Sequence, residues 1–363
     1  MVSLSPEQWG LLDELHSGGR FRQEFHAAFA NGAAFLAARD GLRGRRPIVV
    51  EWRGGQRQPG DEPVPADLRI DHVFLVSCKY LSKIVTNSSP ATVFDRLLSG
   101  GHGGRSADWY AEVAPDRYQA LYQDVLAHMA STPTLEGSGL GPGTGAGCGT
   151  GLGRGTGIGT GAGSAAEAGA EVGTGPGTGV AARAEAGIGD GSGEAWPAEV
   201  GALTPVQRRA LRHALGGGRW PAPLRPSATA FACAVAEASA DRWRAALAGA
   251  DRERALWRLL RIGSAPYFVL GASGDGSLRL RIGTAWDWRQ HFRIVDVAVT
   301  PAVREQPVVE WAVTVAGRRS AAERTVAGHV EVRWSHGKFA QPPEAKVYLD
   351  TPHAKVPGYW PLT

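Results

Sequence analysis

Residues 67–79 read DLRIDHVFLVSCK and decide how this chain folds. A short apolar segment tipped by two acids leads into an apolar run that ends in Ser-Cys-Lys. In one extended strand Asp71 and Lys79 would stand roughly 26 Å apart, too far to share a ligand. We therefore predict a hairpin that turns near Asp71 and brings Asp67 beside Ser77.

Alternation along the second strand of this hairpin sorts its polar side chains. Ser77 and Lys79 project from one face, whereas Cys78 projects from the other, where we expect a core position and not a thiol nucleophile. The hairpin thus gathers a carboxylate, a hydroxyl and an ammonium group at one end of a buried strand. Asp67 is the better geometric partner of Lys79. Asp71, at the turn, remains a candidate for the same site.

Two acids outside the hairpin could join this group. Glu51 ends an apolar strand expected over 47–52, and Glu24 lies on an expected helix. Oxygen ligands with open positions suit Mg²⁺, or Mn²⁺ in its place. Such a metal beside a Lys activates water and stabilises charge on a phosphate, as phosphodiester hydrolysis requires. We therefore predict a metal site from Asp67, Asp71 and Glu51.

This arrangement resembles the PD-(D/E)xK, restriction-endonuclease-like nucleases. Their core is a helix carrying a Glu, then a strand, a hairpin bearing an Asp and a (D/E)-x-K, and a further helix. The parts of this chain that match, over roughly residues 20–100, are Glu24, the 47–52 strand, Asp67 or Asp71, Ser77-Cys78-Lys79 and a helix after Pro90. Ser77 stands where the family has its second acid.

The resemblance implies a Mg²⁺-dependent nuclease that acts on DNA, in restriction or phage defence. Lys79 would be its charge-stabilising residue, with Ser77, Asp67, Asp71, Glu51 and Glu24 around it. Restriction-type nucleases often work as dimers, so a homodimer is one expected assembly. Because Ser77 replaces an acid, the alternative is a nuclease fold that has lost catalysis and binds nucleic acid or protein.

Lysine is scarce in this chain, because 34 of the 39 basic residues are Arg. Arg is a planar fork and does not replace Lys as a compact point charge. Lys83 therefore joins Lys79 as a candidate phosphate contact. We expect the polar loop that follows, with Asn87 and Ser88, to hold a phosphate at the start of the next helix.

A second basic stretch lies near the C-terminus. Its candidate nucleic-acid contacts are Arg333, His336, Lys338 and Lys346, which alternate with aromatic residues. Cations suit phosphates and aromatic rings suit bases, so this stretch could contact DNA. The same stretch could instead be an ordinary surface hairpin, or an E-x-K site over 344–346 with Asp296 as its upstream acid.

Composition limits the class of protein without deciding it. The net charge of +4 and pI near 9.1 make an acidic partner plausible. Three cysteines without paired spacing argue against a disulfide framework or a zinc site. The N-terminus lacks a secretory signal pattern, and no apolar run is long enough to cross a membrane, so we expect a cytoplasmic protein.

A glycine occupies every odd position from Gly137 to Gly163. Such a tract cannot bury enough apolar surface to offset its ordering entropy. We therefore expect a nuclease-like core over 1–135, a disordered Gly-rich linker over 136–195, and a helical then β-rich part over 196–363 that completes the fold or contacts substrate. The expected class is α+β with an α/β-type core, a mixed central sheet flanked by helices, like that of restriction endonucleases.

Overall fold

The computed structural model describes residues 4–19, 21–53, 66–80, 82–97, 108–131, 195–215, 219–249, 251–273, 276–320, 322–335 and 339–363. The Gly-rich tract lies outside these residues. Met1–Ser131 and Pro197–Thr363 form one compact unit. Among the helices of the described residues, none is long and apolar enough to cross a membrane.

The first sheet, sheet A, has the strand order β1-β2-β3-β5-β6-β11. Its strands are β1 (Val50–Trp52), β2 (Leu68–Ile70), β3 (Phe74–Tyr80), β5 (Tyr267–Ser273), β6 (Gly276–Ile282) and β11 (Tyr359–Pro361). β1, β2 and β3 run antiparallel in turn, whereas β3 pairs with β5 in parallel. Strands from both sides of the Gly-rich tract therefore build one mixed sheet.

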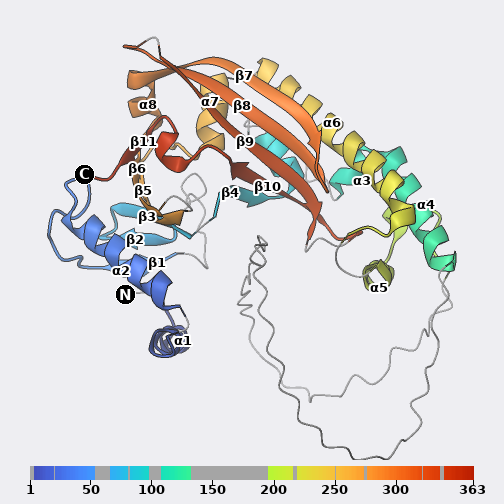
Figure 1. Ribbon diagram of the computed structural model, residues 1–363, viewed down its shortest axis with the longest axis horizontal. Coiled ribbons are helices and arrows are strands. Elements are labelled where there is room, and N and C mark those ends of the chain that lie inside the picture. Colours follow the sequence, from blue (N-terminus) through green and yellow to red (C-terminus); the bar gives the residue numbers. More distant parts are fainter. Residues whose placement is uncertain are drawn as a thin grey trace, which may run out of the picture. The chain divides into compact units, whose positions relative to one another are not determined.

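Two N-terminal helices, α1 (Pro6–Ser17) and α2 (Arg22–Ala37), accompany sheet A (Figure 1). Ser5 caps α1 in a reciprocal capping box with Gln8, which satisfies two backbone donors at its start. α2 buries Phe35 against the sheet, where its ring makes edge contacts with Phe74 and Phe268. Each such ring pair contributes about 0.5–1.5 kcal/mol to stability beyond the burial of its apolar surface. These contacts hold α2 against one face of sheet A.

The second sheet, sheet B, is antiparallel and has the order β4-β10-β9-β8-β7. Its strands are β4 (Ile84–Ser88), β10 (Pro343–Leu349), β9 (Glu323–Trp334), β8 (Pro307–Gly317) and β7 (Phe292–Val303). Helix α6 (Arg225–Gly249) packs against β7 and β8, over a buried face that includes Val309 and Val313 (Figure 1). β4 is the strand that follows β3, so the chain passes from sheet A to sheet B between Tyr80 and Ile84.

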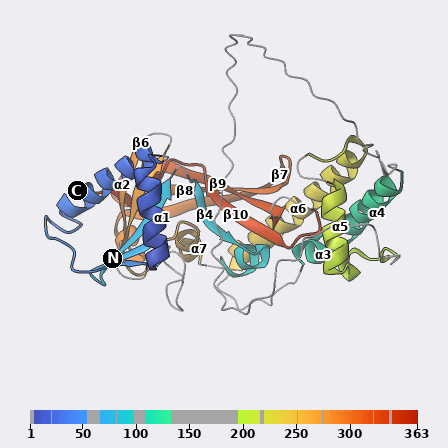
Figure 2. The same cartoon turned by 90° about the horizontal axis from the view of Figure 1, so that it is seen from below.

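Of the remaining helical elements, α3 and α4 pack against α6 (Figure 2), whereas η5 contacts β6 and β11 of sheet A. These remaining elements are η1 (Thr92–Arg96), α3 (Trp109–Val113), α4 (Pro115–Ser131), η2 (Val200–Ala202), α5 (Pro205–Leu215), η3 (Ala222–Leu224), α7 (Arg252–Leu259), α8 (Ala285–His291) and η5 (His353–Lys355). Trp243 of α6 donates its Nε1–H to the carbonyl of Val93, which ties η1 to this layer.

The structure confirms the expected α+β class, with a mixed sheet flanked by helices; a second, antiparallel sheet accompanies it. Some details differ from the sequence predictions. Residues 87–88, expected in a loop, belong to β4, because β10 supplies the hydrogen bonds that a loop would lack. Helix α3 ends at Val113, and Pro115 begins α4, where the missing N–H of proline costs no hydrogen bond.

Candidate functional site

The β2–β3 hairpin turns at Asp71 and His72, as the sequence predicts. The amide of Val73 donates to the carbonyl of Ile70 at 3.1 Å and closes the turn. Asp71 and His72 have φ values of +51° and +58°, the left-handed geometry that matches the twist of a tight hairpin. Leu68 pairs with Val76, and this register places Asp67 opposite Ser77.

Asp67 is bound to the facing strand through its side chain. Its Oδ2 accepts hydrogen bonds from Ser77 Oγ, at 3.3 Å, and from the backbone N–H of Cys78. Ser77 is only 1% exposed, so its hydroxyl requires this partner. The predicted neighbourhood of Asp67 and Ser77 is therefore confirmed, and the carboxylate has a structural role in the hairpin.

Lys79 projects from the same face as Ser77, at the end of β3 where the chain leaves sheet A. Its Nζ donates to the carbonyl of Ile84 at 3.2 Å, which reaches the first residue of β4. Lys83 lies exposed in the connection between the two strands. The amide of Leu349, at the end of β10, donates to the carbonyl of Lys83, so the end of β10 meets this connection.

His353 lies in η5, just beyond β10, and the positive charges of Lys79 and Lys83 act on it. Burial lowers the pKa of His353, and the positive charges of Lys79 and Lys83 lower it further. We call Lys79, Lys83 and His353 the junction cluster, because they meet where sheet A passes into sheet B. Two lysine charges beside a histidine that can take up a proton favour an anion between them.

Glu51 is occupied by partners within the fold. Both of its oxygens accept from the guanidinium of Arg69, the residue opposite it on β2, and His72 Nδ1 lies 3.3 Å from Oε2. The hydrogen bond from Arg69 and the charges of Arg69 and His72 lower the pKa of Glu51 to about 2, against the opposing effect of burial. Glu51 therefore stabilises the β1–β2 edge as a permanently ionised partner of Arg69.

Asp71 is likewise used within the fold. Its Oδ1 accepts from the backbone N–H groups of Ile48, at 2.7 Å, and Val49, at 3.0 Å. Asp71 lies four positions from Asp67 along the chain, about 13 Å in an extended strand. The hairpin that brings Asp67 to Ser77 therefore carries Asp71 to the opposite end.

The metal site expected from Asp67, Asp71 and Glu51 does not fit this geometry. Glu51 is bonded to Arg69, Asp71 to two backbone amides, and Asp67 to the hydroxyl of Ser77 and the amide of Cys78. Within the described ranges, no group of three or more His, Cys, Asp or Glu side chains could hold a metal ion. The three acids therefore do not meet at one point, and a role for Mg²⁺ or Mn²⁺ stays a prediction.

Glu24 lies on the other face of sheet A from Lys79. It accepts a hydrogen bond from Tyr80 Oη at 3.1 Å, and Tyr80 alternates with Lys79 along β3. The structure therefore does not bring Glu24 to the hairpin group, in correction of the sequence prediction. Cys78 shares the face of Tyr80, as predicted, but it is exposed and not part of the core.

The C-terminal basic stretch is divided by the structure. Arg333 donates to Glu344 at 2.7 Å, and Lys346 stands between Glu331 and Asn87 on neighbouring strands. His336 and Lys338 lie outside the described residues. Asn87 and Ser88 point to opposite faces of β4, so the expected phosphate loop is not formed there.

The strand positions also show whether the E-x-K site considered over 344–346 can form. Glu344 is bonded to Arg333, and Asp296 lies on β7, three strands away from β10, about 14 Å across the sheet. These acids therefore do not meet in an E-x-K site.

The helix that follows Pro90 is the five-residue η1. The amide of Thr92, its first residue, donates a hydrogen bond to Ser89 Oγ.

Sequence reasoning missed His353 in the junction cluster. It lies far along the chain from Lys79, and only the pairing of β4 with β10 brings the two together. The one available signal was the scarce Lys355, two residues beyond it.

The fold and this junction define a mixed α+β protein with a basic cluster beside a hairpin carboxylate. No family model, no curated protein and no solved structure matches the chain. The interpretation of the site therefore depends on its own geometry.

Proposed function

We propose that this chain binds nucleic acid, DNA in the first instance, through the junction cluster. The observation that carries the proposal is the convergence of Lys79, Lys83 and the end of β10 that precedes His353, where β3 passes into β4. A phosphodiester backbone supplies the anion that would relieve their mutual repulsion. In this proposal the hairpin acts as a binding module, in the way that a nuclease fold without catalysis would.

The positive charge of the cluster favours contact with the phosphate backbone of a nucleic acid and not with its bases. Lys83 is exposed, and Lys79 and His353 are half-buried, so a phosphate would reach Lys83 first. Asp67 lies at the same end of the hairpin and repels an anion that approaches too closely. Binding of this kind depends strongly on salt and weakly on sequence.

Hydrolysis of DNA is the second candidate, and one observation favours it. Asp67, Ser77 and Lys79 share one face of the hairpin, in the order that the resemblance to PD-(D/E)xK nucleases implies. Mg²⁺ would supply an activated water and neutralise charge on the phosphate. Asp67 is the only expected ligand at this position, since Glu51 pairs with Arg69 and Asp71 caps backbone amides.

One experiment separates the two candidates. Purified full-length protein is incubated with linear and supercoiled DNA in Mg²⁺, in Mn²⁺ and in chelator, beside the Lys79→Gln variant. We expect retarded DNA under all three conditions and no cleaved product. Metal-dependent cleavage that Lys79→Gln abolishes would establish the nuclease candidate instead, and protein that neither retards nor cleaves DNA would overturn both.

A further inference from the structure

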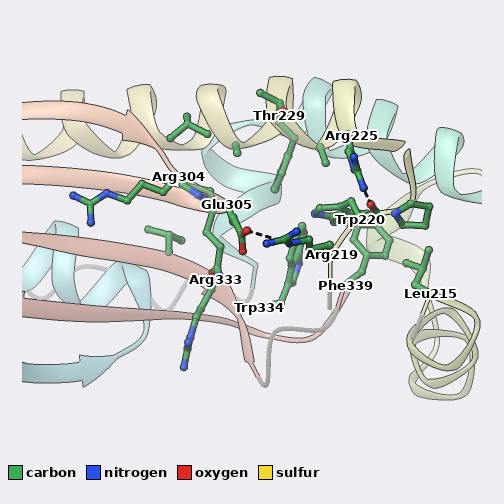
Figure 3. A pocket seen from close by; sticks show the side chains of 18 residues that line it. Leu215, Arg219, Trp220, Arg225, Thr229, Arg304, Glu305, Arg333, Trp334 and Phe339 are labelled. Atoms are coloured by element: carbon green, nitrogen blue, oxygen red, sulfur yellow. Dashed lines mark hydrogen bonds and ion pairs between the residues drawn. The ribbon is translucent and has the colours of Figure 1, made fainter. Parts of the chain in front are cut away.

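A pocket of about 400 Å³ opens at the end of sheet B, on the side of α6 (Figure 3). The start of α6, residues 219–221, the β7–β8 turn and the end of β9 form its walls. The volume lies within the range of small-molecule sites, about 300–1,000 Å³. The pocket uses none of the residues of the junction cluster.

Aromatic rings form one wall of this pocket. Trp334 stacks on Phe231 with ring centroids 5.3 Å apart, and Trp220 meets Trp334 edge-on at 5.8 Å. Phe339 closes the group, 5.2 Å from Trp334. Trp220 and Trp334 are only half-buried, so each keeps ring surface that a planar ligand could cover.

Two arginines supply cationic groups at the rim. Arg225 donates Nε–H to the carbonyl of Trp220 at 3.2 Å, and no carboxylate among the described residues pairs with its guanidinium. Arg219 lies 3.5 Å from Glu305, and both side chains are about four-fifths exposed, 84% and 79%. An exposed ion pair of this kind contributes little to stability, so Arg219 can exchange Glu305 for another anion.

The two remaining arginines of the lining are directed elsewhere. Arg304 pairs with Glu310 at 2.9 Å and Arg333 with Glu344 at 2.7 Å. In Figure 3 both lead away from the aromatic wall, whereas Arg219 and Arg225 approach Trp220. The anionic part of a ligand is therefore expected beside Arg219 and Arg225.

Gln306, in the β7–β8 turn, adds an independent sign of a ligand. It lines the pocket, and its Oε1 is buried without a hydrogen-bond donor among the described residues. A buried acceptor in this state is unfavourable, because it has lost its hydrogen bonds to water without gaining others. A ligand that brings an N–H group would remove that cost.

We propose that this pocket binds a nucleotide, with its base against Trp220 and Trp334 and its phosphate on Arg225 and Arg219. A nucleobase combines the three properties that the pocket selects: a planar ring, N–H donors for Gln306, and an attached anion. The source is either a free nucleotide or an unstacked nucleotide of a single strand. The proposal stands on residues separate from the junction cluster and does not depend on the proposed function.

Calorimetric titration of the full chain with AMP, with adenosine, with ribose 5-phosphate and with the tetranucleotide d(AAAA) tests this site. We expect AMP to bind more tightly than either fragment. Arg225→Gln should weaken AMP binding at least about tenfold, which corresponds to about 1.4 kcal/mol, and should leave adenosine binding nearly unchanged. Arg209→Gln, an exposed position on α5 outside the pocket, is the matched control.

Two further variants complete the design. Trp220→Phe, which keeps an aromatic ring in the wall, should weaken both AMP and adenosine severalfold. Lys83→Ala should leave AMP binding unchanged, so failure of the junction cluster would not be mistaken for failure of the pocket. Tighter binding of d(AAAA) than of AMP identifies a strand as the source, and the reverse identifies a free nucleotide.

The proposal is overturned if neither AMP nor d(AAAA) binds at millimolar concentration. Binding that Arg225→Gln and Trp220→Phe leave unchanged would overturn it as well, because the nucleotide would then occupy some other part of the chain.

Discussion

Ser77 donates its hydroxyl hydrogen to Asp67 across the β2–β3 hairpin, with 3.3 Å between Ser77 Oγ and Asp67 Oδ2. In the PD-(D/E)xK pattern the position of Ser77 would hold an acid, and two carboxylates at this distance would repel each other without a cation. Serine turns the same position into a hydrogen-bond donor. The hydrogen bond from Ser77 therefore helps to hold this hairpin together through its own side chains.

Removing the carboxylate of Asp67 should therefore destabilise the hairpin. Asp67→Ala leaves the buried hydroxyl of Ser77 and the amide of Cys78 without their acceptor, and we expect a loss of about 2–3 kcal/mol in the free energy of unfolding. Ser77→Ala removes a single bond and should cost about 1 kcal/mol. Urea denaturation measures both, and an Asp67→Ala variant as stable as the parent would contradict this role.

Replacement of glycine by alanine should have opposite effects on stability at two positions, Gly271 and Gly10. A Cβ at Gly271 on β5 would lie 1.5 Å from the carbonyl oxygen of Lys79, a clash that only a shift of the β3–β5 pair could relieve. Gly271→Ala should therefore destabilise the protein by more than about 3 kcal/mol. Gly10 in α1 has open space around it, so Gly10→Ala should stabilise by about 0.5–1 kcal/mol.

Thermal unfolding of these two variants beside the parent is the measurement. A Gly271→Ala protein that melts at the parent temperature would show that sheet A does not pair β3 with β5 at this register.

The Glu51–Arg69 pair predicts an acid-sensitive β1–β2 edge. The pKa of Glu51 is about 2 in the fold against a reference value of 4.5. A carboxylate with a lowered pKa stabilises the fold above the reference value and loses that contribution as the pH falls toward about 2. Glu51→Gln, which does not titrate, should lack this loss.

The melting temperatures of the parent and of Glu51→Gln should therefore converge as the pH falls from about 4.5 to about 2. A difference in melting temperature that stays constant across this range would show that the ionised Glu51–Arg69 pair is not its source.

The sequence predicted much of the hairpin because local rules decide it. Separation excluded a single strand, and alternation placed Ser77 and Lys79 on one face, as observed. The role of Glu51 could not be predicted from the sequence, because Arg69 is identified as its partner only once the β1–β2 register is known. A charged side chain near a candidate site can belong to the site or to the adjacent strand, and sequence spacing alone does not distinguish these.

Long-range pairing explains the remaining differences. β4 carries Asn87 and Ser88 and lacks the apolar alternation of a typical strand, and its partner β10 is encoded far downstream. His353 joins the junction cluster through the same pairing. Glu24 failed as a site residue because a helix can cover either face of a sheet, and α2 covers the face that carries Tyr80.

His353 should make nucleic-acid binding depend on pH. Its pKa lies below the reference value of 6.5, through burial and the charges of Lys79 and Lys83. A bound phosphate raises that pKa, so binding takes up a proton and tightens as the pH falls below about 6.5. In the free protein the same lowered pKa destabilises the fold over this range, because the unfolded chain binds the proton more readily.

Fluorescence anisotropy of labelled DNA at a series of pH values measures this effect. The parent should bind more tightly at the acidic end, and His353→Ala should lose the slope. An equal slope in the two proteins would remove His353 from the binding surface.

The salt dependence of DNA binding by Lys83→Ala is the sharpest test of binding at the junction cluster. Lys83 is exposed, so its loss should leave the fold unchanged while reducing the slope of log K against log salt by about one. Lys346→Ala, on sheet B, is the matched control and should keep the slope of the parent. A slope unchanged in Lys83→Ala, or reduced only in Lys346→Ala, would contradict binding at the junction cluster.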